Sequence, residues 1–215
     1  MKMNRTIDTV DVHTNGRPFR LVTRGLPKFS GTTLAERRAW LERNADHWRR
    51  ALFLAPRGYA GLAGGFLTEP VSEGANLGMI FVDADGYFER NDDGAIALAT
   101  VAVALGWIER SAPETRVGID LPGRVVEAFV KWDGDHAGTV RLAGAQTRAV
   151  AHRAYLHAAH AAVGATRHAK DAKEPRHAAA PAWTALPQTA GRARICGFSN
   201  WIIDESDPFA YGCVL

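Results

Sequence analysis

Two adjacent carboxylates, Asp92 and Asp93, are the residues whose type and spacing most directly suggest chemistry. They stand immediately before Gly94, where a long apolar run begins. A pair of carboxyl groups can exchange protons with a substrate as general acid and general base. Carboxylates at the start of a helix more commonly cap it and interact favourably with its dipole. We favour the capping interpretation and keep acid–base chemistry as the alternative.

The histidines of the alanine-rich part of the chain are a second set of groups that could do chemistry, as metal ligands. Two histidines that share a metal on one helix are usually spaced i, i+4. These histidines miss that spacing, and no cluster of acidic residues accompanies them. We therefore predict no metal site and interpret the segment as solvated and basic. The histidines are His152, His157, His160 and His168.

The two cysteines, Cys196 and Cys213, both lie close to the C-terminus. Their number and spacing fit neither a zinc site nor a framework of several disulfides. We interpret both as reduced residues with a structural role.

Composition limits the classes of function. The 215 residues are 47% hydrophobic, which is enough to bury a substantial core. No apolar run reaches the roughly 18 residues that cross a bilayer, and the first residues lack the apolar stretch of a signal peptide. We expect a cytoplasmic protein that does not contact membranes. The net charge is +3, but residues 148–194 hold eight Lys or Arg against two Asp or Glu. This argues against a nucleic-acid-binding surface spread over the fold, although the basic segment alone could contact polyanions.

Several elements must form to position the carboxylates. Short segments of alternating or β-branched residues, bounded by turn residues, predict strands, and the first two flank the turn Asn15-Gly16 as a β-hairpin. A capping box, Thr33 with Glu36, opens a single amphipathic helix that continues to Pro56. The predicted strands are 5–12, 19–24, 66–68, 77–82, 87–88, 116–121 and 125–132.

The carboxylates themselves precede the most apolar segment of the chain. The run from Gly94 to Ile108 is apolar on every side, which predicts a helix buried all round and a sheet wrapped around it. The pattern is clear up to about Leu142. Residues 146–189 are rich in alanine, histidine and arginine and contain prolines, so we predict a linker with a helical turn or two near 155–162.

Four blocks of the sequence, taken in order, resemble the proline racemase family. Three come from the first half of the chain, and the fourth resembles the closing segment of the family. Together they contain 87 of the 215 residues, and four ordered blocks are more specific than any single motif. The blocks read DVHTNGRPFRLV (11–22), ERRAWLERNADHWRRALFLAPRGYAG (36–61), LGMIFVDADGYFERNDDGAIALAT (77–100) and GRARICGFSNWIIDESDPFAYGCVL (191–215).

This resemblance implies an α+β fold like that of diaminopimelate epimerase, with two similar lobes and the substrate between them. Each lobe is a curved, mostly antiparallel sheet around a buried central helix. The chain offers one such lobe in residues 1–145. A linker at 146–190 stands in place of the second lobe, and residues 191–215 are expected to pack on the first.

The resemblance also implies a chemistry. Members of the family are cofactor-independent racemases, 2-epimerases and dehydratases that act on proline or hydroxyproline. They place two thiols on opposite sides of the α-carbon, so that one removes a proton and the other returns it. A helix N-terminus lowers the pKa of such a thiol and binds the substrate carboxylate.

The first of these thiols belongs to a Met-Cys-Gly-His-Gly motif, which is altered in this chain. Asn91 stands at the cysteine position, Asp92 and Asp93 follow it, and Gly94 is kept. An amide is not a proton-transfer base near neutral pH. The carboxylates would repel a substrate carboxylate, so the anion site is degenerate. Two further residues, His13 and Thr14, match a block near the substrate pocket, although a buried histidine bonded to the backbone explains the first equally well.

Three hypotheses follow from the sequence. The chain could descend from racemases, epimerases or dehydratases and retain negligible turnover. It could be a non-catalytic binding or assembly protein whose exposed lobe face pairs with a second copy or with an intact relative. It could also be a decayed gene product, because the bias of residues 146–189 is what a shifted reading frame of a GC-rich gene can give.

Overall fold

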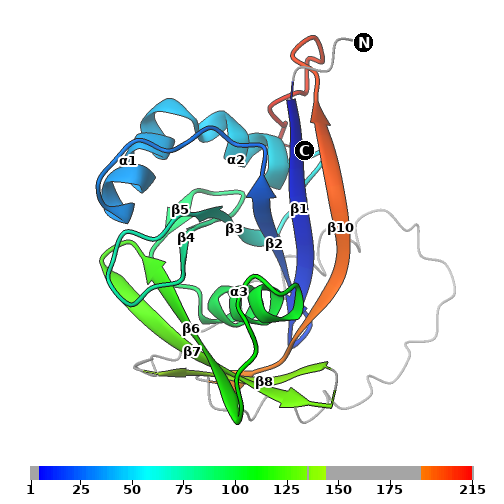
Figure 1. Cartoon of the computed structure of the whole chain (residues 1–215). Coiled ribbons are helices and arrows are strands. Elements are labelled where there is room, and N and C mark those ends of the chain that lie inside the picture. The colour runs from blue at the N-terminus through cyan, green and yellow to red at the C-terminus, as the bar shows by residue number, and fades with distance from the viewer. Residues whose placement is uncertain (1–4, 135, 144–189, 215) are drawn as a thin grey trace, which may run out of the picture.

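The computed structural model describes residues 5–134, 136–143 and 190–214 (Figure 1). The predicted linker, its predicted helical turns and the histidines considered above fall outside these residues. Three helices are described: α1 (Leu34–Asn44), α2 (Asp46–Phe53) and α3 (Asp92–Ala104). The described strands are β1 (Arg5–Thr14), β2 (Arg17–Arg24), β3 (Ala63–Thr68), β4 (Leu77–Val82), β5 (Tyr87–Phe88), β6 (Glu114–Leu121), β7 (Arg124–Asp133), β8 (His136–Ala143), β9 (Ala190–Gly191) and β10 (Ala193–Ile203).

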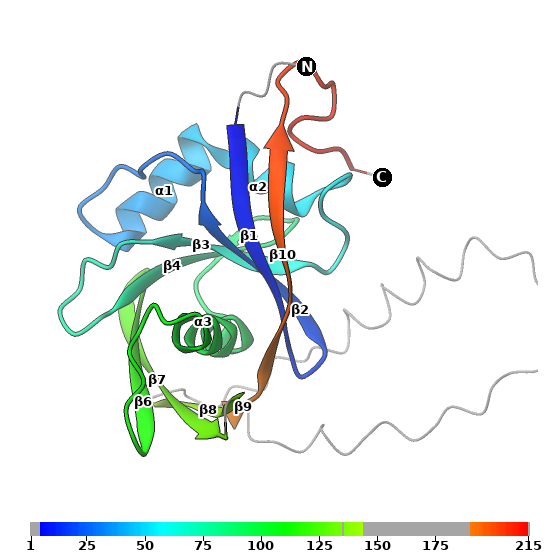
Figure 2. The same ribbon diagram turned by 45° about the vertical axis from the view of Figure 1, so that its right-hand side comes forward.

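These strands form one curled sheet. Its order from margin to margin is β10-β1-β2-β3-β4-β6-β7-β8-β9, with β5 beside β4. Neighbouring strands run antiparallel except at β2/β3 and β4/β6, which confirms the predicted mostly antiparallel sheet. Because β9 pairs with β8 while β10 pairs with β1, residues 190–203 belong to both margins and join them. The strands therefore surround α3, which Figure 2 shows end-on.

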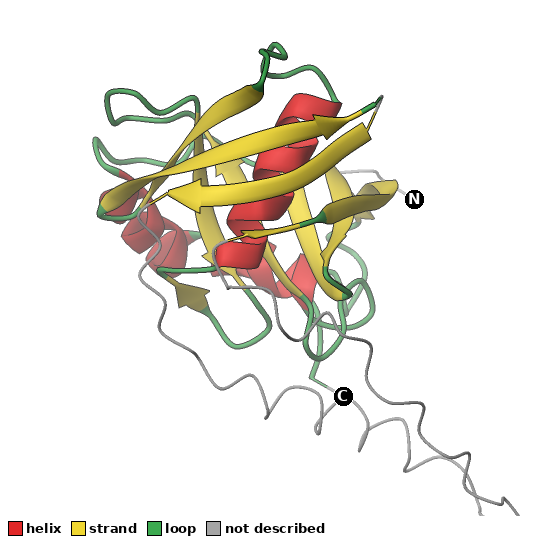
Figure 3. Ribbon diagram, turned by 90° about the horizontal axis from the view of Figure 1, so that it is seen from below, coloured by secondary structure: helices red, strands yellow, loops and turns green. Residues whose placement is uncertain are grey.

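The helix α3 is the centre of the larger core. Its residues from Gly94 to Val103 are all buried, as the unbroken apolar run predicts. Side chains from β1, β2, β4, β6, β7, β8 and β10 pack around it, and Figure 3 shows the helix enclosed by strands. Burying an aliphatic side chain stabilises a fold by roughly 1.5–3 kcal/mol, so this helix contributes a large part of the stability of the lobe.

The helix ends earlier than the apolar run predicts. It stops at Ala104, and Leu105 and Trp107 are partly exposed. Gly106 has a φ of +72°, a left-handed conformation that glycine adopts without strain. The N–H groups of Trp107 and Ile108 both reach back to the Ala102 carbonyl, which closes the helix end.

A second core lies on the other face of the sheet, under α1 and α2. The capping box that opens α1 is present, since the Thr33 side chain accepts from the Glu36 N–H and the Glu36 side chain accepts from the Thr33 N–H. Burial of Trp48, Leu52 and Phe53 fastens α2 to β3 and β4. The predicted helix packing against the sheet is therefore correct.

The prediction of one continuous helix is wrong. Ala45, with φ −144° and ψ 22°, separates α1 from α2. Asp46 then pairs with Arg49 through two bonds of 2.6 and 2.8 Å. Arg49 also donates to the carbonyls of Asp83 and Ala84, which fixes α2 against the β4–β5 turn. These contacts join distant parts of the chain, so helical periodicity does not reveal them.

Every predicted strand is present, but three described strands, β8, β9 and β10, were not predicted as strands. The first hairpin turns at Asn15 and Gly16, whose φ angles are 51° and 86°, as an Asn-Gly turn requires. The strand β8 is absent from the predictions because its sequence, HAGTVRLA, is poor in β-branched and aromatic residues. Within the described part of the chain, no helix is long and apolar enough to cross a membrane.

Candidate functional site

The candidate site is the N-terminus of α3. Asn91 is the N-cap residue: its backbone is extended, and its side-chain oxygen accepts from the Gly94 N–H at 2.9 Å. The Asn91 carbonyl accepts from the Ala95 N–H as the first bond of the helix. The sequence predicted that the carboxylates cap this helix. The structure gives the capping bond to Asn91 instead, because the asparagine is the residue just before the first helical turn.

Both carboxylates are paired with arginines. Asp92 accepts two bonds from Arg90, at 2.9 and 2.7 Å. Asp93 accepts from Arg17, whose Nε and Nη2 lie 2.7 and 2.8 Å from its two oxygens. The bond from Asp92 raises the pKa of the Arg90 guanidinium above its usual range. Negative charge at this end of a helix is also favoured by the dipole, so the charges are balanced within the lobe itself.

The end of β1 reaches the same place. The buried hydroxyl of Thr14 donates to the Asp93 carbonyl at 3.0 Å. His13 is half-buried, and its Nδ1 accepts from the Gly16 N–H at 3.2 Å, within the hairpin turn. Thr14 therefore contacts the start of α3 directly, whereas the described contact of His13 is to its own turn. The bond to the backbone fits the structural alternative for His13, but the side chain is half-buried and not buried as that alternative expects.

Gly94 is required by packing. A Cβ at this position would lie 2.6 Å from the ring of Phe19 and 2.7 Å from the ring of Phe81, both of which are buried. These two rings meet edge to face, with centroids 6.2 Å apart. The glycine lets the first turn of α3 approach β2 and β4 closely, so its place in the motif has a structural cause independent of any ligand.

This arrangement has defined chemical limits. No thiol, imidazole or amine belongs to the motif at 90–94, and its amide is occupied in the capping bond. The carboxylates are held in ion pairs, so proton transfer by either would require breaking a bidentate contact. A neighbouring groove carries charges of both signs. Its lining includes Arg38, Glu42, Glu89, Arg90 and Arg124.

Sequence reasoning brought together Asn91, Asp92, Asp93, Gly94 and Thr14, and the structure does the same. It missed the two arginines that balance the carboxylates. Arg90 is the first residue of the motif at 90–94, so its spacing to Asp92 was a usable signal. Arg17 lies 76 residues from Asp93 in sequence and gives no such signal.

The remaining sites considered from the sequence can be placed in part. Among the described residues, no three His, Cys, Asp or Glu side chains gather closely enough to hold a metal ion. Cys213 is half-buried and donates to the Ala55 carbonyl at 3.5 Å. Cys196 is exposed on β10, which does not fit the structural role predicted for it. Neither thiol lies in the motif at the start of α3.

A curled α+β sheet around a buried helix defines the class of protein. The solved structure of a hydroxyproline epimerase from Agrobacterium vitis, with bound trans-4-OH-L-proline, resembles this chain with a TM-score of 0.62 and 26% identity. The match covers 66% of this chain and 42% of that one. A sequence profile of the family described as proline racemase matches residues 9–165. The chain therefore belongs to the proline racemase family.

Relatives of known name support the same assignment. A trans-3-hydroxy-L-proline dehydratase of Azospirillum brasilense is 58% identical over 142 residues, which are 66% of this chain and 42% of that protein. A 3-hydroxyproline 2-epimerase of Burkholderia multivorans is 57% identical, with the same coverage of both chains. Proline racemase A of Trypanosoma cruzi is 39% identical, over 59% of this chain and 30% of that protein. The chain thus spans about two fifths, or less, of the length of these relatives.

Proposed function

We propose that this chain is the first lobe of a proline racemase-family protein and does not itself turn over proline or hydroxyproline. Its ancestors would have acted on these substrates without a cofactor. The proposal combines two features: an amide at the position where the resemblance places a reactive thiol, and coverage of about two fifths of the length of the named relatives.

The observation that carries the proposal is the state of Asn91. A helix start that binds a substrate carboxylate must offer free N–H groups and no nearby negative charge. Here the Gly94 N–H donates to Asn91, and the first turn contains Asp92 and Asp93. Arg90 and Arg17 pair with these two carboxylates. The site therefore supports a structural role for a motif that served catalysis in the lineage.

We propose the same division of the chain that the sequence predicts. Residues 1–145 form the lobe, 146–190 connect it, and 191–215 close it. Pairing of β10 with β1 along most of both strands supports the last part. Inversion of an α-carbon requires a base on each side of it, so one lobe without a partner lacks the second base whatever stands at position 91.

Direct assay tests the proposal. Purified protein is incubated with L-proline, trans-4-hydroxy-L-proline and trans-3-hydroxy-L-proline, and racemisation, epimerisation and dehydration are followed by chiral chromatography. We expect no product above the rate without protein. Turnover that persists in the Asn91→Ala and Asp93→Ala variants would place the chemistry elsewhere and overturn the proposal. Turnover abolished by either variant would show that the altered motif is itself catalytic.

A further inference from the structure

A groove lies between one face of α1 and the turn that joins β6 to β7 (Figure 1), and we call it the α1 groove. Its volume is about 610 Å³, which lies within the range of roughly 300–1,000 Å³ that small-molecule sites occupy. Ala35, Ala39 and Glu42 line it from α1, with the spacing of residues that share one face of a helix. The two alanines and Gly123 of the turn are small, so they leave the space between the helix and the turn open.

Two of the three arginines that line the α1 groove already have carboxylate partners. Arg38 lies 3.6 Å from Glu89 and donates to the Tyr87 carbonyl at 3.2 Å. Arg90 is held by Asp92 through its Nε and Nη2 atoms. The charges of these two pairs cancel, so they determine neither the sign nor the position of a charged ligand.

One unpaired charge of each sign remains in the α1 groove. Arg124, directly after the turn, is half-buried, and its side chain has no hydrogen bond, ion pair or ring contact among the described residues. Glu42, on α1, is exposed and has no hydrogen bond or ion pair in the same part of the chain. A guanidinium that is partly removed from water is stabilised by a carboxylate, and a glutamate in the same groove is stabilised by an ammonium group. The groove therefore suits a ligand that carries one charge of each sign.

We propose that the α1 groove binds a short zwitterionic peptide, with the peptide carboxylate on Arg124 and the peptide ammonium on Glu42. The Nη1 atom of Arg90, which takes no part in the contact with Asp92, is available to a carbonyl of the peptide. Among the described residues, the lining contains no aromatic or long aliphatic side chain, so the groove favours peptides with small side chains. Binding leaves the contact between Arg90 and Asp92 intact, so the proposal holds whether or not the chain is catalytic.

Trialanine and its two blocked forms test whether both charges of the peptide are recognised. The titration is followed by NMR on the amide signals of Ala39 and Gly123, which belong to the two walls of the groove. We expect trialanine to shift both signals in a saturable way. Acetylation of the peptide removes its ammonium and amidation removes its carboxylate. Each should raise the dissociation constant about tenfold, because one charge-assisted contact is lost.

Two substitutions assign each end of the peptide to its residue. Arg124→Gln should weaken the binding of trialanine about tenfold, and amidation should then have no further effect, because the carboxylate has no partner left to lose. Glu42→Gln should in the same way remove the effect of acetylation.

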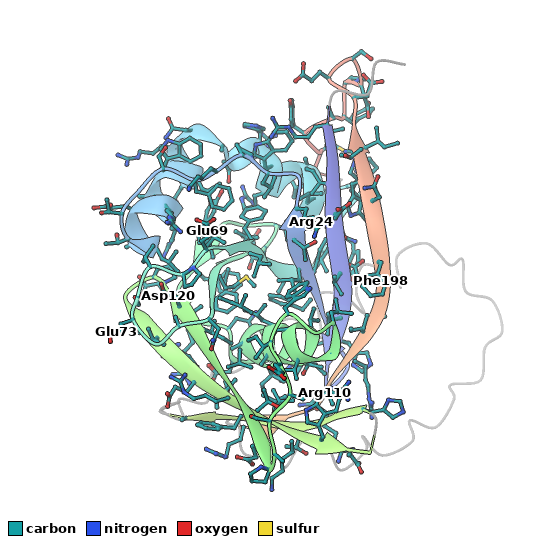
Figure 4. All side chains as sticks on the ribbon, viewed as in Figure 1. Arg24, Glu69, Glu73, Arg110, Asp120 and Phe198 are labelled. Atoms are coloured by element: carbon teal, nitrogen blue, oxygen red, sulfur yellow. The ribbon has the colours of Figure 1, made fainter. Side chains whose placement is uncertain are left out.

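Arg24→Gln and Glu73→Gln are the matched controls for these substitutions. Both residues are exposed and lie outside the α1 groove, and Figure 4 shows Arg24 at the end of β2 and Glu73 in the loop before β4. Both variants should bind trialanine as the parent protein does, and circular dichroism confirms that every variant is folded. A titration without saturable shifts, equal affinity for the free and blocked peptides, or an effect of amidation that persists in Arg124→Gln overturns the proposal.

Discussion

At the residue scale, the start of α3 has an asparagine with a structural role at the position where the resemblance to the family places a thiol. Asparagine is among the best N-cap residues because its side-chain oxygen accepts from a free N–H of the first turn. Asn91 does this at 2.9 Å. The resemblance implies a thiol at the position of Asn91, and the sequence contains carboxylates suited to the helix dipole. It did not show which residue caps the helix, since that depends on where the first helical residue falls.

We expect Asn91→Ala to lower the free energy of unfolding by about 1 kcal/mol, because the Gly94 N–H loses its acceptor. Asn91→Asp should retain most of the stability, since the carboxylate offers the same oxygen. Urea unfolding followed by tryptophan fluorescence measures both. Equal losses in the two variants would indicate that the capping bond does not stabilise the helix.

Restoring the motif should restore reactivity but not turnover. In the triple variant Asn91→Cys, Asp92→Gly and Asp93→His, the helix again offers N–H groups to a thiol and no carboxylate stands beside it. We expect the pKa of that thiol to fall below its ordinary value of about 8.5. The rate of alkylation against pH gives this value once Cys196→Ser and Cys213→Ser remove other thiols.

Racemisation by the triple variant should remain absent, because the proposed single lobe supplies no second base on the opposite side of the substrate. A thiol pKa at the ordinary value would contradict the assignment of this helix start to the family's first motif. Racemase activity would contradict the proposal that the chain has a single lobe and no second base. The two results therefore test separate claims.

At the scale of elements, the sequence predicted those structures that depend only on residues close together in the chain. The Asn15-Gly16 hairpin, the Thr33–Glu36 capping box and the buried run of α3 were all predictable from neighbouring residues. The break at Ala45 was not, because Arg49 bonds to carbonyls of the β4–β5 turn, 34 and 35 residues away. The pairing of Arg17 with Asp93 was hidden for the same reason.

The helix α2 gives a prediction about pH. His47 packs against Trp48 and Tyr211, with ring centroids 4.6 and 5.0 Å away. Burial lowers the pKa of His47 below its ordinary value, and nearby Arg5 adds to this effect while Asp46 opposes it. The unfolded chain therefore binds a proton first as the pH falls. The contribution of this group is complete above about pH 6.5 and is lost as the pH falls from there through the folded-state pKa.

We expect the free energy of unfolding to decrease between pH 7.5 and 5.5, and to decrease less in His47→Gln. Urea unfolding at pH 7.5 and at pH 5.5 measures the free energy of unfolding of both proteins. The other histidines are the same in both, so any difference in pH dependence is due to His47. An identical pH dependence in the two proteins would remove His47 as the cause.

At the scale of the whole molecule, the lobe is held together by the two ends of the described chain. The pairing of β1 with β10 extends from Arg5↔Ile203 to Thr14↔Ala193. Ala193 joins the core around α3, and Ile203 joins the core under α2. The resemblance of the last block to the family's closing segment pointed to this role. Sequence patterns do not determine which strands pair, so they predicted neither the register of β1 with β10 nor the joining of the two sheet margins.

Removal of this segment should therefore abolish cooperative folding. We expect a chain ending at residue 189 to lose its sharp thermal transition in circular dichroism, because β1 and one side of α3 become exposed. A chain ending at Ile203 keeps β10 and should retain the transition at a lower midpoint temperature. A sharp transition in the shorter chain would show that the sheet closes without β10.

The joined margins also bear on the order of events during protein synthesis. All described strands around α3 except β9 and β10 are complete when Ala143 leaves the ribosome. The two margins of the sheet can join only after Ile203, the last residue of β10, has followed. At typical elongation rates the intervening stretch takes about 3–12 s. Throughout that interval the nascent chain presents the full length of β1 as an unpaired margin beside an exposed apolar helix, which is the kind of surface that chaperones bind and that aggregates other chains. We therefore expect the risk of aggregation to be highest while the chain is still bound to the ribosome.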